Sequence, residues 1–242
     1  MPSIYLSAIF PAFNESQRIL PTLQLALKYF NQKAFRYEII VVDDGSEDGT
    51  VEVCQQAFAD EQHIRLVRLR QNHGKGYAIK AGIEAARGEY ILFADADNST
   101  PIEEFDKFFP ELSPTTVLIG SRFLQPELIE RRQPWYRIAI SRLANLVVRI
   151  LLIKKVRDTQ CGFKVFHRGI AAQLVQHQHI HRYGFDIEYL TIAMQNGAEI
   201  KEIPVRWINS PVSRIRPLRD SLGTLWDLCR ITFNCWRGIY RN

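Results

Sequence analysis

Two aspartates at the end of an apolar run are the residues best suited to chemistry. In ILFADADNST, residues 91–100, Asp95 and Asp97 are separated by one alanine. Residues two apart in an extended segment point the same way, and paired carboxylates repel unless a cation lies between them or one is protonated. Mg²⁺ and Mn²⁺ prefer oxygen ligands, which phosphates can complete. The pair therefore indicates a site for a metal and a diphosphate, with a solvated loop as the alternative.

The elements that must position this pair can be predicted from hydrophobic periodicity. Helical spacing is clear from Ile19 to Phe30, and further helices are expected from about Val51 and over 77–86. Buried strands are predicted at 4–10, 37–42, 64–69, 89–94 and 116–121. Strands that alternate with helices predict an α/β protein with a mostly parallel sheet covered by helices on both faces. Such sheets bind ligands at the carboxyl ends of their strands.

Three more polar clusters follow predicted strands and should lie at the same edge as the aspartate pair. They are PAFNE (11–15), DDGS (43–46) and QNHGKG (71–76). Asp43 and Asp44 could accept hydrogen bonds from a ribose or a base, or could cap the next helix. Lys75 between two glycines suits a phosphate or a nucleobase edge, although neither a Walker loop nor a dinucleotide fingerprint is present.

Composition narrows the class of protein. The chain has 242 residues, 46% hydrophobic and 24% charged, with a net charge of +5, which fits one globular domain with a C-terminal extension. We expect its four scattered cysteines to be reduced. No signal peptide and no apolar run of the ~18 residues needed to span a membrane is apparent. Arginines concentrate in 122–157 and 201–241, which favours an anionic surface or substrate over ordinary solvated charge.

The motifs together resemble a known family. PAFNE, VVDDGS, GKG, DAD, GSR (120–122) and DTQCGFK (158–164) occur in the order and spacing of glycosyltransferase family 2. The resemblance is nearest to its polyprenyl-phosphate branch, the dolichyl-phosphate β-glucosyltransferases and mannosyltransferases, and DTQCGFK is similar to the glucosyl type. It implies a GT-A, Rossmann-like fold and a metal-dependent inverting hexosyltransferase.

The resemblance also implies roles for individual residues. Asp95 and Asp97 would hold Mg²⁺ or Mn²⁺ and the diphosphate, and Asp97, Arg122 and Arg137 would carry the transfer. The remaining substrate-binding positions that it implies are Pro11, Ala12, Glu15, Asp44, Lys75, Ser141 and Arg214. Asp43 and Arg131 are proposed from their own chemistry, Arg131 as one of the arginines that would neutralise the acceptor. Two departures concern the metal and the acceptor: Ser99 stands where the mannosyl branch often has a glutamine ligand, and Arg214 replaces a lysine.

The expected reaction needs no catalytic base, because a polyprenyl monophosphate is already anionic. Arginines would neutralise it through charge-assisted contacts. The expected partners are a nucleotide-diphosphate sugar (UDP-glucose favoured, GDP-mannose possible), a polyprenyl phosphate and a membrane surface, but no nucleic acid. Two alternatives are a family member with a hydroxyl acceptor, for which Asp186 would be the base, and a non-catalytic nucleotide-sugar binder at the membrane.

The expected organisation is a GT-A domain over residues 1–216 and a C-terminal amphipathic helix over 217–242. Within the domain, residues 134–153 are predicted to form a helix at the interface or the acceptor site. The C-terminal stretch places apolar residues on one stripe, namely Leu218, Leu222, Leu225, Cys229, Phe233, Trp236 and Tyr240. This pattern predicts a helix on the membrane surface, with packing on its own domain as the alternative. We therefore expect a peripheral protein on the cytoplasmic side of a membrane.

Overall fold

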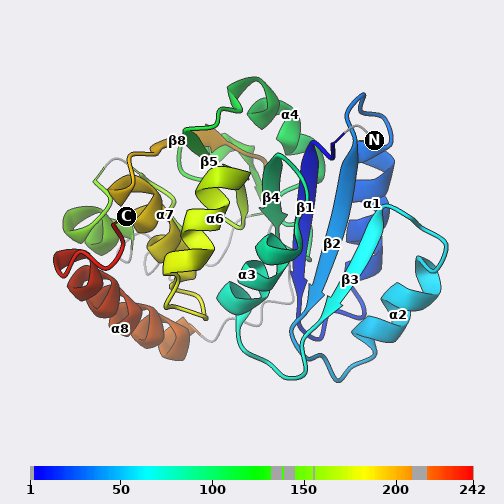
Figure 1. The fold of residues 1–242 in the computed structure, drawn as a ribbon, viewed down its shortest axis with the longest axis horizontal. Helices are drawn as coiled ribbons and strands as arrows, with labels where there is room; N and C mark the ends of the chain where they lie inside the picture. The colour runs from blue at the N-terminus through cyan, green and yellow to red at the C-terminus, as the bar shows by residue number, and fades with distance from the viewer. Residues whose placement is uncertain (1–2, 132–137, 139–144, 155, 209–216, 242) are drawn as a thin grey trace.

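Among the residues that the structure describes, seven strands form one sheet with the order β3-β2-β1-β4-β7-β5-β8 (Figure 1). The computed structural model describes residues 3–131, 138, 145–154, 156–208 and 217–241, with the backbone alone for Arg131 and 217–222. The strands are β1 (Leu6–Ala12), β2 (Tyr37–Asp43), β3 (Ile64–Arg68), β4 (Tyr90–Ala94), β5 (Thr116–Ser121), β7 (Phe163–His167) and β8 (Glu199–Pro204). A separate small sheet pairs β6 (Ile129–Arg131) with β9 (Trp207–Ile208).

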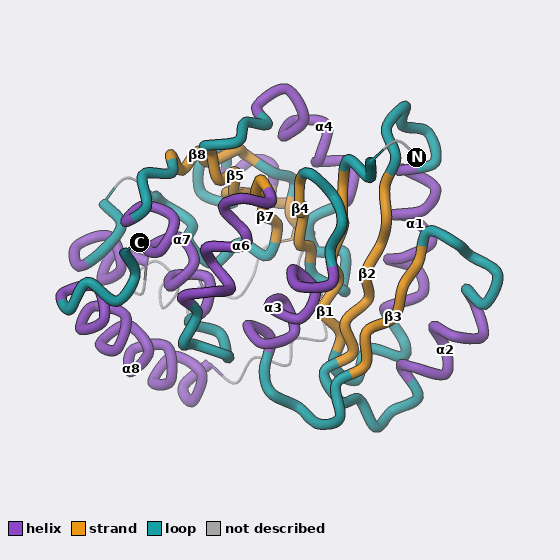
Figure 2. The backbone as a smooth tube through the Cα atoms, in the orientation of Figure 1, coloured by secondary structure: helices purple, strands orange, loops and turns teal. Residues whose placement is uncertain are grey.

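Helices cover both faces of the large sheet (Figure 2). They are α1 (Ile19–Phe30), α2 (Thr50–Ala57), α3 (Lys75–Ala85), α4 (Phe105–Phe108), α6 (Arg168–His177), α7 (Phe185–Gln195) and α8 (Pro217–Trp236). Alternate residues of β1 enter different cores: Ile9 packs in the layer of α3, α6 and α7, whereas Ala8 and Phe10 pack in the layer of α1 and α4. This alternation follows from the two-residue period of a strand. The predicted α/β class is confirmed.

The sheet is mostly parallel, as predicted, with one reversed strand in its middle. β7 lies between β4 and β5 and runs antiparallel to both, while β1 to β4 and the pair of β5 and β8 are parallel. The last two residues of the motif DTQCGFK, Phe163 and Lys164, begin β7, so this motif enters the sheet beside β4, the strand that Asp95 follows. The sequence reading did not anticipate β7 or β8.

The C-terminal helix packs on the domain through one side and leaves another side open. Leu228, Ile231 and Tyr240 are buried in the core shared with α6 and α7. Four large apolar side chains are more than half exposed, namely Leu225, Trp226, Phe233 and Trp236. The structure has a helix over Pro217–Trp236, which ends before Tyr240. The predicted stripe is wrong for Tyr240, because this residue follows the helix and its hydroxyl donates to the buried Glu188 over 2.8 Å.

Two further observations bear on the predicted relation to a membrane and to redox conditions. None of the helices in the described parts of the chain is both long and apolar enough to span a bilayer. A helical segment at 145–151 carries three exposed apolar side chains, Leu146, Ile150 and Leu151, while its Val148 packs in the same core as Leu228 of α8. All four cysteines are free thiols, as expected.

Candidate active site

The polar clusters predicted to share an edge do so, because the parallel strands end level with one another. Ala12 at the end of β1 pairs with Asp43 at the end of β2, and Asp43 pairs with Arg68 at the end of β3. Pro11 lies one residue before the end of β1, half-buried. The loops that follow these strands therefore start side by side at the carboxyl edge, together with the loop after β4 that carries Asp95.

The loops after β1 and β2 are tied into one unit by short hydrogen bonds. The Asn14 amide donates to Ser46 Oγ over 2.7 Å, and the Glu47 amide donates to Asn14 Oδ1 over 2.8 Å. The Glu15 amide donates to Thr50 Oγ1 over 2.8 Å. Asn14 has a φ of 54°, a left-handed conformation that asparagine tolerates better than most residues. Glu15 is thereby held at the sheet edge.

The two aspartates of DDGS are buried and shape the loops of the protein itself. Asp43 accepts the amide of Ser46. The two oxygens of Asp44 accept the amides of His73 and Gly74, each over 2.8 Å. Burial raises the pKa of Asp44, although these two hydrogen bonds lower it. Their positions at the sheet edge fit the sequence prediction, and their contact with a nucleoside stays a prediction.

Lys75 opens α3 and points its ammonium at the aspartate pair. Gly74 before it has a φ of 104°, and a Cβ there would lie 2.6 Å from the carbonyl oxygen of His181. The Lys75 ammonium lies 2.5 Å from Asp95 Oδ1. Burial lowers the pKa of Lys75, but the charges of Asp95 and then Asp186 raise this pKa by a larger amount, so the net shift is upward. The lysine is therefore charged and held against the first aspartate.

Asp95 and Asp97 lie in a tight turn directly after β4. The Asp95 amide donates to the carbonyl of Gly162 over 3.1 Å, and a Cβ at Gly162 would lie 2.0 Å from Asp95 Oδ2. Only glycine fits at that position. Asp97 Oδ1 accepts the Ser99 amide over 3.0 Å. Burial, and next the charge of Asp95, raise the pKa of Asp97.

Arg18 connects the first loop to this turn. Its guanidinium donates to both carboxylate oxygens of Glu15, over 2.7 and 2.6 Å. Its Nη1 lies 3.8 Å from Asp97 Oδ2. Ser99, the residue at the place of a glutamine ligand in relatives, is buried, and its carbonyl accepts the Ile208 amide over 2.8 Å. The turn with the two aspartates is thus fixed from three sides.

The donor set fits a divalent cation that shares its coordination with a phosphate. The side chains of Asp95 and Asp97 are 36% and 24% exposed, so a ligand can reach them. Within the described ranges, no group of three or more His, Cys, Asp or Glu side chains is arranged to hold a metal. Two carboxylates alone would leave several coordination positions of an octahedral ion open. Mg²⁺ typically fills such positions with water and with the phosphates of a substrate.

Arg122, which follows β5, is locked in place by a buried aspartate. Its Nε and Nη2 each donate to the Asp158 carboxylate over 2.7 Å, and its amide donates to the same group over 3.0 Å. The guanidinium also lies 5.5 Å from the Trp207 ring. Burial lowers the pKa of Arg122, but Asp158 raises it more, and the Asp158 pKa is held low in turn. Nη1 has no hydrogen-bond partner within the described part of the chain.

A fully buried lysine lies beneath the site. Lys164 on β7 is 0% exposed, and its ammonium contacts Asp186 on α7 and the carbonyl of Cys161. The ammonium lies 5.1 Å from the Phe93 ring. Burial raises the pKa of Asp186, against the lowering effects of Lys164 and Lys75. Asp186 is thus an ion-pair partner inside the protein rather than a group that projects to the surface.

Some predicted positions cannot be placed. Arg137, Ser141 and Arg214 lie outside the described residues, and Arg131 is described only as the last backbone position of β6. The structure therefore brings Pro11, Ala12, Glu15, Asp43, Asp44, Lys75, Asp95 and Asp97 to one edge, with Arg122 close enough for Asp95 to affect its pKa.

Comparison with known proteins decides the family. Residues 7–175 match the model of the family described as Glycosyl transferase family 2. This match covers more than half of the chain. The chain belongs to glycosyltransferase family 2.

Curated relatives and solved structures agree with this assignment. A dolichyl-phosphate beta-glucosyltransferase of Homo sapiens is 37% identical over 99% of this chain and 78% of its own length, and one of Dictyostelium discoideum is 35% identical over 99% and 77%. Glucosyl-3-phosphoglycerate synthase of Mycobacterium tuberculosis, crystallised with Mn²⁺ and UDP-glucose, superposes with a TM-score of 0.72 at 18% identity, over 95% of this chain and 80% of its own. The latter likeness concerns the fold, and the predicted resemblance to the family is confirmed.

Three residues of this family 2 chain were missed as parts of the site by sequence reasoning. Asp158 and Lys164 were noted only as the first and last residues of the motif DTQCGFK, with no role assigned to either, and Arg18 was not considered. Lys164 carries a signal that could have been used, because a single lysine stands among the apolar residues of FKVFH, a buried strand. The contact of Arg18 with Asp97 and that of Asp158 with Arg122 join different loops, and no local pattern predicts them.

Proposed function

We propose that the chain transfers a hexose, with glucose favoured, from a nucleotide-diphosphate sugar to a polyprenyl monophosphate, with inversion at the anomeric carbon. The observation that carries the proposal is the meeting of Asp95, Asp97 and Lys75 at the carboxyl edge of the sheet in a family 2 chain. Relatives more than 30% identical over nearly the whole chain are named for glucose and dolichyl phosphate. Their substrate class is therefore the first to test.

Asp95 and Asp97 would hold Mg²⁺ or Mn²⁺. When bound, a divalent ion would offset the charge that develops on the nucleoside diphosphate as it leaves. Burial, and next the charge of Asp95, raise the pKa of Asp97, and a cation between the two aspartates would offset their repulsion. Lys75, already charged and 2.5 Å from Asp95, would supply a second positive group to the same diphosphate. Pro11, Ala12, Glu15 and the Asp43–Asp44 pair would border the nucleoside.

On the acceptor side, Arg122 would bind the monophosphate. Asp158 fixes its guanidinium through Nε and Nη2, which leaves Nη1 to face an anion without further loss of side-chain freedom. Arg131, Arg137, Ser141 and Arg214 remain proposed members of this side. The nucleophile needs no base, because a phosphate monoester is ionised at neutral pH.

The state of Asp186 favours a phosphate acceptor over a hydroxyl acceptor. A hydroxyl nucleophile needs a base within hydrogen-bond reach of the reacting group. Asp186 was the candidate for that base, but its side chain is 5% exposed and paired with Lys164. A buried carboxylate already bound to an ammonium is badly placed to accept a proton from a bound alcohol.

The exposed apolar side chains of α8 and of residues 145–151 would rest on the bilayer in which the acceptor is anchored. Trp226 and Trp236 are 68% and 84% exposed, and Arg230 on the same helix and Arg237 directly after it are exposed as well. Apolar and aromatic side chains flanked by arginines are typical of helices that lie in the membrane interface. The chain would then act as a peripheral protein, and its placement on the cytoplasmic side is part of the proposal.

The deciding experiment is an assay for glycolipid. The purified protein is incubated with Mn²⁺, a short polyprenyl phosphate and radiolabelled UDP-glucose, and the lipid phase is counted, with GDP-mannose in a parallel reaction and an Asp97→Asn protein as the control. We expect label in the lipid phase from UDP-glucose and little from the control. Transfer only to a hydroxyl acceptor such as an alkyl glycoside, or no transfer from any donor, would overturn the proposal.

A further inference from the structure

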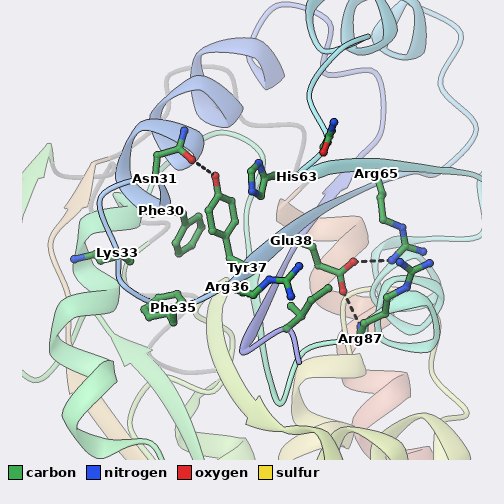
Figure 3. A pocket seen from close by; sticks show the side chains of 12 residues that line it. Phe30, Asn31, Lys33, Phe35, Arg36, Tyr37, Glu38, His63, Arg65 and Arg87 are labelled. Carbon is green, nitrogen blue, oxygen red and sulfur yellow. Dashed lines mark hydrogen bonds and ion pairs between the residues drawn. The ribbon is translucent and has the colours of Figure 1, made fainter. Parts of the chain in front are cut away.

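A separate pocket lies at the other edge of the sheet, where β2 and β3 begin (Figure 3). Its volume is about 380 Å³, and its walls come from the end of α1, the first residues of β2 and β3, and the turn after α3. The candidate active site lies at the carboxyl ends of these same strands. The pocket is therefore distinct from the site that carries Asp95 and Lys75.

Positive charge dominates the wall of this pocket. Four cationic side chains, Lys33, Arg36, Arg65 and Arg87, line it against a single carboxylate, Glu38, among the described residues. The Lys33 ammonium is already paired with a neighbouring acid, Asp106, over 2.5 Å. Three guanidinium groups thus line a wall that contains one carboxylate, and only that of Arg65 donates to this carboxylate. An added anion would relieve the repulsion among the cationic groups.

The buried Glu38 fixes the Arg65 side chain and the backbone of Arg87 at the wall of the pocket. It is only 3% exposed and accepts hydrogen bonds from Ser7 Oγ over 2.6 Å and from the Arg87 amide over 2.7 Å. Arg65 Nη1 donates to Glu38 over 2.7 Å and to the Ala85 carbonyl over 3.1 Å. One guanidinium nitrogen of Arg65 therefore makes both contacts, while its Nε and Nη2 have no partner in the described ranges of the chain.

The Arg87 side chain is exposed, and its guanidinium makes no hydrogen bond to any described residue, because only the backbone of Arg87 contacts Glu38. Figure 3 shows Arg65 and Arg87 on the same side of Glu38, with Arg36 between Glu38 and Tyr37. The planar guanidinium groups of Arg65 and Arg87, whose N–H groups are open toward the described residues, match the oxygens of a phosphate in a bidentate way.

The rest of the wall is aromatic. The Tyr37 ring stacks on the His63 ring with centroids 4.7 Å apart and planes at 15°. The Tyr37 hydroxyl donates to Asn31 Oδ1 over 2.6 Å, which fixes the ring, and Phe30 packs against its other side at 5.2 Å. Tyr37 is buried, so the exposed ring of this stack is His63, which Tyr37 supports from within. A supported flat ring next to cationic groups suits a ligand with both a planar organic part and an anionic group.

We propose that this pocket, defined by Arg36, Arg65, Arg87, Tyr37 and His63, binds an organic phosphate monoester. The phosphate contacts the three guanidinium groups, and the organic part lies against the aromatic wall. The inference is independent of the proposed transferase activity, because none of its residues belongs to the candidate active site.

The test is calorimetric titration of the whole protein with phenyl phosphate, and with inorganic phosphate in a second series, at low salt. Saturating UDP and Mn²⁺ are present to occupy the other edge of the sheet. Arg87→Gln and Arg36→Gln remove one exposed guanidinium each, so both proteins should fold. Arg237→Gln removes an equally exposed arginine from the far end of the chain and serves as the matched control.

We expect phenyl phosphate to bind with a dissociation constant of roughly 1 mM or below and inorganic phosphate to bind more weakly. Each pocket variant should weaken binding by about tenfold, as expected for one lost charge-assisted contact, and Arg237→Gln should not change it. Failure to bind at about 10 mM, or equal affinity in Arg87→Gln, would overturn the proposal. So would loss of binding in Asp97→Asn, since the ligand would then occupy the catalytic edge.

Discussion

Replacing Lys164 by methionine tests the interpretation of the buried charge beneath the active site. The substitution keeps the length of the side chain but removes the ammonium that contacts Asp186. Asp186 has a side chain only 5% exposed and would be left buried with a weaker set of partners. Breaking a buried ion pair in this way typically costs about 3–5 kcal/mol. For a chain of 242 residues, each kcal/mol lowers the melting temperature by roughly 2–4 °C, so a drop of about 6–20 °C is expected.

The pH dependence of the stability lost in Lys164→Met follows from the pKa of Asp186. Burial already raises this pKa, and removal of Lys164 takes away the largest effect that lowers it. A carboxyl group whose folded pKa lies above its unfolded value binds more protons in the native state, so it reduces stability as the pH rises through that window. Lys164→Met should therefore lose more stability at pH 8 than at pH 5.

Urea unfolding followed by tryptophan fluorescence measures these differences. Lys201→Met is the matched control, because Lys201 is a strand lysine paired with Glu111 in which both side chains are more than 40% exposed. It should change the free energy of unfolding by less than about 1 kcal/mol. The double variant Lys164→Met with Asp186→Leu should regain most of the loss. A loss below about 1 kcal/mol, or additive effects in the double variant, would refute the reasoning.

Three further predictions concern the proposed reaction. Asp97→Asn should reduce transfer by ~10²-fold or more while thermal stability stays equal or rises, because one of two neighbouring like charges is removed; full activity in this variant or in excess EDTA would contradict the metal site. Arg122→Lys should raise the KM for polyprenyl phosphate more than the dissociation constant of UDP-glucose, measured by calorimetry; equal effects would place Arg122 on the donor side. Trp226→Ser with Trp236→Ser should release the protein from anionic liposomes in a flotation assay without lowering its melting temperature, since both side chains are exposed; unchanged flotation would contradict the membrane surface proposed for α8.

Much of the catalytic edge was predictable because its signals are local. Mostly apolar runs of six or seven residues, each followed within a few residues by a cluster rich in Asp, Asn or Gly, indicated strands that end at a common edge. The positions of Asp43, Asp95 and Lys75 follow from that pattern and from the rule that parallel strands present their carboxyl ends together. The helix at the C-terminus was likewise visible as a periodic stripe that includes Leu225 and Phe233.

What these residues contact was decided only by the tertiary structure. Asp44 and Glu15 were taken as ligand-binding groups, yet their carboxylates are engaged by His73, Gly74 and Arg18 of the chain itself. The burial of Tyr240, which follows α8, was also set by a distant partner, Glu188. Such pairings depend on which elements pack together, and the period of a helix or strand carries no information on that choice.

The amino-acid sequence by itself determined the order of elements, the edge at which the polar clusters gather and the family to which the chain belongs. The tertiary structure alone decided that β7 enters the sheet antiparallel between β4 and β5, which buries Lys164 against Asp186 and brings Asp158 to Arg122. The physical reason is that a buried charge needs a partner, and this partner comes from a different element 22 residues away for Lys164 and 36 for Arg122. Local patterns fix the kind of each element, whereas long-range packing fixes which charges meet.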